Sequence, residues 1–171
     1  MTKLKGLRVF APATVANVAC GYDVLGFAIE EPGDEIVVKE TEEFEGLRII
    51  SIHGDPEHRL PFDVGKNTAG VSAQMLLDEV DYKGPGIEMK IYKKMPFGTG
   101  LGSSSASAVA GVVAVNQLLG RPFKKRDLLK FAIAGEQAAD GAVHGDNVAP
   151  CLMGGMVLVR DAHLAEAHRI L

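Results

Sequence analysis

The chain has 171 residues, of which 47% are hydrophobic and 23% are charged, and its formal net charge is −4. This length suits one domain, or one domain and part of another. The acidic balance gives no reason to expect nucleic acid or an anionic membrane as a partner. No segment reads as a signal peptide or a bilayer span, and two cysteines without metal-type spacing favour a reduced, cytoplasmic protein.

Short apolar runs between turn residues predict five strands, at 7–11, 34–39, 47–52, 86–93 and 156–159. The first strand is expected to break at Pro12, which cannot donate to a sheet. The acidic segment 40–46 is expected to connect the second and third strands as a hairpin. The polar segment 53–61 favours a surface loop over a metal site at His53 and His58.

Helical spacing and end signals predict three helices. The first begins after Asn67, a good N-cap residue, and ends near residue 80. The second, 106–119, is apolar nearly all round and is therefore expected to be buried. The third, 127–139, carries Glu136 near its end, where a carboxylate opposes the helix dipole; a solvent-facing side chain is the ordinary alternative. Segment 142–150 is expected to be a loop, and 160–171 has no clear terminal element.

A run of glycines and serines between the strand at 86–93 and the buried helix indicates a phosphate-binding loop. The run matches neither GxxxxGK[ST] nor GxGxxG. A plain glycine turn capped by a serine is the alternative. The residues of this loop are Pro96, Phe97, Gly98, Thr99, Gly100, Leu101, Gly102, Ser103, Ser104, Ser105 and Ala106.

Two further polar clusters stand out. Asn17 and Asp23 lie among small and apolar neighbours, where turn residues that bond their own backbone are the ordinary explanation. His144, Asp146 and Asn147 form a compact group beside an apolar strand, although a lone histidine is more often structural.

Taken together, three motifs resemble the GHMP family of small-molecule kinases and, within it, the homoserine kinases. Residues 12–26 read PATxANxxxGYDVLG, residues 96–106 read PxxxGLGSSxA, and residues 144–150 read HGDNVAP. The resemblance implies an α+β fold like the second domain of ribosomal protein S5. It places the ATP-binding domain at 1–160 and the start of a ferredoxin-like second half, largely absent from this chain, at 161–171. The activity implied is ATP-dependent phosphorylation of the L-homoserine hydroxyl in threonine biosynthesis.

The resemblance also implies roles for individual residues. The backbone from Pro96 to Ala106 would wrap the ATP phosphates, and Asn67 would contact the nucleoside. Mg²⁺ would be held by Ser104 and Glu136, since a hard cation prefers oxygen ligands. The amino-acid substrate would be held by Asn17, Asp23, His144 and Asp146.

Asn147 occupies a position where some GHMP kinases carry an aspartate base. An amide is no useful proton acceptor, so we expect transfer without a protein base, with Asp146 as the rival base. Another GHMP kinase, of mevalonate or sugar type, and a nucleotide-binding module without turnover are the alternatives. A homodimer is left open. The part of the family fold that is missing would leave apolar surface exposed, which predicts self-association.

Overall fold

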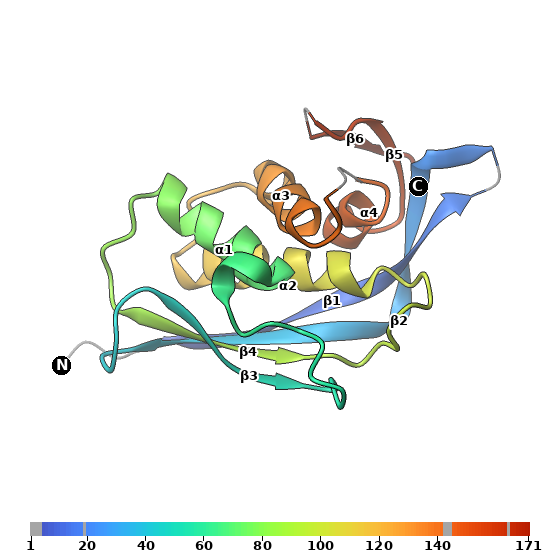
Figure 1. Cartoon of the computed structure of the whole chain (residues 1–171). Helices are drawn as coiled ribbons and strands as arrows, with labels where there is room; N and C mark the ends of the chain where they lie inside the picture. Colours follow the sequence, from blue (N-terminus) through green and yellow to red (C-terminus); the bar gives the residue numbers. More distant parts are fainter. Residues whose placement is uncertain (1–4, 19, 142–144, 164) are drawn as a thin grey trace.

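The computed structural model describes residues 5–18, 20–141, 145–163 and 165–171. In this part of the chain, helices gather on one face of a curved sheet, so the fold has one helical layer and one sheet layer (Figure 1). The described strands run in the order β3-β4-β2-β5-β6, and β1 pairs with β2. This mixed arrangement confirms the α+β fold class.

The described elements have the following bounds. The strands are β1 (Gly6–Val18), β2 (Gly21–Thr41), β3 (Leu47–His53), β4 (Gly86–Tyr92), β5 (Met156–Asp161) and β6 (Glu166–Arg169). The helices are α1 (Thr68–Glu79), α2 (Ser103–Leu118), α3 (Leu129–Asp140) and α4 (Val148–Met153), with 3-10 turns at Val64–Lys66 and Lys125–Leu128. No helix among the described residues is long and apolar enough to cross a membrane.

Strand β2 is the centre of the sheet, because it is antiparallel to β1, β4 and β5. The outer parts of β1 and β2 form an arm that projects beyond the helices (Figure 1). The predicted break at Pro12 is wrong. The strand continues to Val18 through a register shift between Pro12 and Thr14, and such irregularities accommodate a residue without an N–H group.

The predicted hairpin across 40–46 is also wrong. Strand β4 lies between β2 and β3, antiparallel to the former and parallel to the latter. A polar connection marks where two strands are separated in sequence, but it does not determine which strands pair. Here α1 carries the chain back over the sheet and lets β4 insert between its two predecessors.

The core forms where the inward residues of β2 and β4 meet α2. Ile36, Val38 and Ile91 are fully or almost fully buried. Most of α2 is also buried, which confirms the expectation from its apolar sequence. Small residues let the helices approach closely: a Cβ on Gly111 of α2 would lie 2.5 Å from the carbonyl oxygen of Ala69 in α1.

Local signals located some helix ends and missed others. Asn67 caps α1 as predicted, with its side chain accepting a hydrogen bond from Ala69 N at 3.1 Å. Helix α2 begins at Ser103, three residues earlier than expected. The short helix α4 occupies part of the expected loop at 142–150, and β6 lies in the tail with no expected element. These two elements are too short for a periodic pattern, and packing against neighbours defines them. The domain boundary after residue 160 stays a prediction.

Candidate active site

The chain between β4 and α2 forms a glycine loop at the start of α2. Gly98, Gly100 and Gly102 have φ angles of 70°, 73° and 68°, a region that favours glycine. Gly102 is the N-cap of α2, and no side chain caps the helix there, so the alternative of a serine-capped turn does not describe this end. The N–H groups of the first turn and the positive end of the helix dipole are thus suited to an anion.

Contacts from distant parts of the chain hold the far end of this loop. Thr14 of β1 donates its backbone N–H to Leu101 O at 3.0 Å and its hydroxyl to Asn147 Oδ1 at 2.8 Å. A Cβ on Gly102 would lie 2.2 Å from Thr14 Oγ1 and 3.0 Å from Asn147 Oδ1. A glycine is therefore needed at 102 for two reasons, its backbone conformation and the close approach of Thr14.

A cleft of about 630 Å³ opens beside the loop. Arg59 and Lys66, two exposed cations that suit a phosphorylated ligand, line it together with Lys93, whose charge is paired with the buried Asp34. Most of the nucleotide-site residues predicted from the sequence also line it, namely Asn67, Pro96, Phe97, Gly98, Thr99, Gly100, Leu101, Gly102, Ser103, Ser104 and Ser105. The predicted metal ligand Glu136 and the predicted catalytic position Asn147 line it as well.

Ser104 and Glu136 reach this cleft from different helices. Ser104 is half-buried in the first turn of α2, and Glu136 of α3 is 7% exposed, so the alternative of a solvent-facing glutamate does not hold. Magnesium takes one or two protein oxygen ligands and completes its shell with water and substrate phosphates. A hydroxyl and a carboxylate on one cleft fit that requirement, and both residues stay candidates for the metal site.

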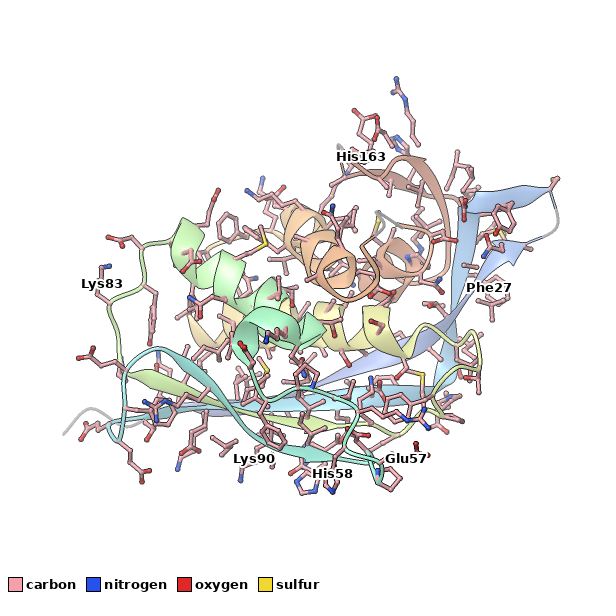
Figure 2. The ribbon with its side chains drawn as sticks, viewed as in Figure 1. Phe27, Glu57, His58, Lys83, Lys90 and His163 are labelled. Carbon is pink, nitrogen blue, oxygen red and sulfur yellow. The ribbon has the colours of Figure 1, made fainter. Side chains whose placement is uncertain are left out.

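His53 is the last residue of β3, and His58 lies in the loop that follows it. The ring of His53 stacks on Tyr92 with centroids 4.6 Å apart. Figure 2 shows Glu57 and His58 at the outer edge of the loop after β3, away from the helices. Among the residues that the structure describes, no group of three or more His, Cys, Asp or Glu side chains is arranged to hold a metal ion.

Two of the predicted nucleotide contacts have other structural duties. The Asn67 amide caps α1 and also donates to Pro61 O at 2.9 Å. Ala106 is fully buried, does not line the cleft, and donates its N–H to Gly102 O within α2. Its N–H is therefore committed to the helix, while Asn67 keeps a place on the cleft wall.

Asn17 and Asp23 lie near the tip of the β1–β2 arm, not on the cleft. Both are exposed, both have positive φ angles of 58° and 56°, and Asp23 N donates to Asn17 Oδ1 at 2.8 Å. This local bonding is what the turn interpretation predicts. Their predicted role in substrate binding stays a prediction.

The second polar cluster, which holds the predicted substrate residues His144 and Asp146 and the predicted catalytic position Asn147, is divided. Asn147 lines the cleft, whereas Asp146 is 2% exposed and does not. The carbonyl of Asp146 packs against Gly26 of β2, where a Cβ would lie 1.9 Å from the oxygen. His144 lies outside the described residues.

Comparison with known proteins places this arrangement in a family. A family model for the N-terminal domain of GHMP kinases matches residues 67–155, from the cap of α1 through the glycine loop to the end of α4. The chain belongs to the GHMP kinases.

Among individual GHMP kinases, the homoserine kinase of Chlorobium phaeobacteroides is 45% identical over 166 residues, which cover 92% of this chain and 51% of that protein. The crystal structure of homoserine kinase from Cytophaga hutchinsonii matches with a TM-score of 0.91 at 51% identity, over 99% of this chain and 52% of that one. The Methanococcus jannaschii mevalonate kinase shares the fold, with a TM-score of 0.74 at 19% identity over 98% of this chain and 56% of that one. The chain thus spans about half the length of the relatives it matches.

Sequence reasoning missed three residues of this GHMP kinase site. Thr14 docks the loop, and Asp34 and Lys93 form a buried ion pair beneath it. A signal was available for the last two. Side chains two residues apart in a strand point to the same face of the sheet. Asp34 therefore lies on the same face as the buried Ile36 and Val38 of β2, and Lys93 lies on the same face as the buried Ile91 of β4.

Proposed function

We propose that this chain is the ATP-binding half of a homoserine kinase, which transfers the γ-phosphoryl group of ATP to the hydroxyl of L-homoserine. The observation that carries this proposal is the 51% identity with the Cytophaga hutchinsonii homoserine kinase over 99% of the chain. The glycine loop and its cationic cleft support the nucleotide part of the assignment. The products are O-phospho-L-homoserine and ADP.

In this proposal the loop acts through its backbone. Phosphoryl transfer depends mostly on positioning and on stabilising negative charge, and little on covalent chemistry by the protein. The N–H groups of the loop and of the first turn of α2 would hold the phosphates, and Arg59 and Lys66 add positive charge at the cleft. Ser104 and Glu136 would hold Mg²⁺, which supplies charge neutralisation at the phosphates.

We infer that no side chain acts as the base. The amide of Asn147 cannot usefully accept a proton, and its oxygen already accepts from the Thr14 hydroxyl. The substrate hydroxyl oxygen attacks the γ-phosphorus, the bond to the β–γ bridging oxygen breaks, and the hydroxyl proton passes to the transferred phosphate. Asp146 is the rival base, and its burial away from the cleft lining favours the base-free route. An Asp146→Asn variant that still binds homoserine should keep its turnover within about tenfold, and a loss of several orders of magnitude would establish a base.

The test is ADP release from Mg-ATP, measured in separate assays with L-homoserine, mevalonate or galactose as the acceptor. Release that depends on homoserine supports the proposal, and release that depends on another acceptor points to a different GHMP kinase. The second candidate is a nucleotide-binding module without turnover. It is favoured by the position of Asn17 and Asp23, which belong to β1 and β2 and do not line the cleft. Calorimetric binding of Mg-ATP without any acceptor-dependent ADP release would support it.

We also infer that the protein works in a reducing compartment such as the cytoplasm. Cys20 is exposed and Cys151 is buried, and both are free thiols. Reduced thiols are the ordinary state of cytoplasmic proteins.

A further inference from the structure

A buried ion pair lies beneath the glycine loop, at the point where β4 ends. Asp34 and Lys93 face each other one step beyond the last paired residues of β2 and β4, Glu35 and Tyr92. The Asp34 side chain is 0% exposed and that of Lys93 is 3% exposed. Burial lowers the pKa of Lys93, while the Asp34 carboxylate opposes that shift.

The hydrogen bonds of Asp34 reach both ends of the loop. Its Oδ1 accepts from the backbone N–H of Lys94 at 2.7 Å and of Met95 at 3.2 Å, where the chain enters the loop. Its Oδ2 accepts from the Ser103 hydroxyl at 2.7 Å, where the chain leaves the loop. One carboxylate thus joins the two ends.

Lys93 strengthens the same connection on the exit side. Its ammonium group donates to Ser103 O at 2.7 Å and to Ser107 Oγ at 2.6 Å, and it is ion-paired with Asp34. A buried ion pair is a poor source of stability unless its geometry and its additional hydrogen bonds repay the loss of water. Here those additional hydrogen bonds go to the backbone of the loop ends and to the first two turns of α2.

We propose that the Asp34–Lys93 pair is a positioning device that fixes the two ends of the glycine loop in the conformation that binds ATP. This inference rests on the proposed ATP binding by the loop. The pair is neutral overall, so its effect is geometric: it sets the spacing between the end of β4 and the start of α2, and so the direction of the N–H groups between them.

The substitution Asp34→Asn separates this role from simple electrostatics. Removing a negative charge next to a phosphate site should tighten ATP binding if only charge matters. Loss of positioning should instead weaken Mg-ATP binding by about tenfold, the effect typical of losing a group that orients a binding shell. The matched control is Glu35→Gln, which removes the same charge one residue away, from a carboxylate that pairs with Lys94 and Arg8. We expect that variant to bind within about twofold of the wild type.

Calorimetry on the 171-residue chain, combined with amide hydrogen exchange without ATP, completes the test. Positioning predicts faster exchange at residues 94–105 in Asp34→Asn and unchanged exchange in Glu35→Gln. Unchanged or tighter Mg-ATP binding by a folded Asp34→Asn variant would overturn the proposal. If Asp34→Asn does not fold, Ser107→Ala is used in its place, because it removes a hydrogen-bond partner of Lys93 that lies outside the loop. Hydrogen exchange in the loop of Ser107→Ala at the wild-type rate would then overturn the proposal. A wild-type chain that fails to bind Mg-ATP would overturn the proposed function, but the exchange test of the pair would still apply.

Discussion

The glycine loop and the tip of the β1–β2 arm carry the two halves of the proposed site, and they are held in different ways. The loop is fixed by residues far away in sequence: Asp34 at both of its ends, and Thr14 and Asn147 at its far side. At the arm tip, the hydrogen bond between Asp23 and Asn17 is local, and both side chains are exposed.

This difference indicates which part of the site the chain can organise by itself. Long-range contacts to buried groups keep a loop in one conformation, whereas an exposed turn has few contacts to oppose its motion. We therefore expect the chain to bind the nucleotide through a preorganised loop. We expect the acceptor side to gain contacts when another surface or the substrate covers it.

The largest effect is predicted for Gly102→Ala. The new Cβ would meet Thr14 Oγ1 at 2.2 Å, in a backbone conformation that already disfavours alanine. Since a displacement of about 1 Å in a site can cost about 100-fold, Mg-ATP affinity should fall by about 100-fold. The control is Gly120→Ala, after the other end of the same helix, where φ is 81° and no atom lies within 4 Å of the Cβ. It should lose stability of about 1 kcal/mol and keep its affinity, and equal effects of the two variants on affinity would contradict the docking of the loop.

Glu136→Gln should have the next largest effect. The amide keeps the size of the side chain but removes the carboxylate charge from the cleft wall. If Glu136 holds Mg²⁺, the gain in ATP affinity that Mg²⁺ causes should be about 10- to 100-fold smaller in Glu136→Gln than in the wild type. ATP titrations with and without the ion measure this gain. Glu79→Gln, at the last residue of α1 and with a half-exposed side chain, is the matched control and should change nothing. An unaltered magnesium dependence in Glu136→Gln would remove this residue from the metal site.

The two cysteines report on the two ends of the β1–β2 arm. Cys151 lies at the base of the arm with its thiol against Pro12 O at 3.3 Å, and burial, together with Asp34 and Glu136, raises its pKa far above the ordinary 9.0. As the pH rises, the Cys151 thiol therefore loses its proton in the unfolded chain before it does so in the folded protein. The contribution of Cys151 to stability is complete below pH 9 and is lost as the pH rises above it, by about 1.4 kcal/mol at pH 10.

Urea unfolding at pH 8 and pH 10 measures this loss. Between these two pH values, the free energy of unfolding of Cys151→Ala should fall by less than that of the wild type. In the native protein a thiol reagent should label Cys20 and spare Cys151. Rapid labelling of Cys151 would contradict a packed arm base.

The smallest effect is predicted for Asn17→Ala at the arm tip. The substitution removes the bond to Asp23 N and leaves alanine at a φ of 58°, at a cost of about 1 kcal/mol in stability. Mg-ATP affinity should stay within about twofold, while any turnover that depends on homoserine should fall. Asn17→Gly relieves the backbone strain and serves as the control. A loss of ATP affinity in either variant would mean that arm and loop are coupled.

The difference between local and long-range contacts also explains which features could be predicted from the sequence. Local signals sufficed for the cap at Asn67, the buried helix α2 and the glycine loop, because capping, periodicity and glycine content act over neighbouring residues. The insertion of β4 between β2 and β3 and the pairing of Asp34 with Lys93 depend on which strands meet. The alternation of side chains along each strand could place Asp34 and Lys93 on the buried face, but only the pairing of β2 with β4 brings the two charges together. The resemblance to the GHMP kinases, carried by three motifs, was confirmed for the family.

The most direct test of the account is an NMR titration of the isotopically labelled chain with Mg-ATP. We predict that the amide shifts of Gly98, Gly100 and Gly102 change strongly, that those of Asn17 and Asp23 change little, and that Mg²⁺ with adenosine leaves the loop unchanged. Shift changes that are absent from the loop, or as large at the arm tip as at the glycines, would contradict the claim that this chain carries a preorganised site for the ATP phosphates.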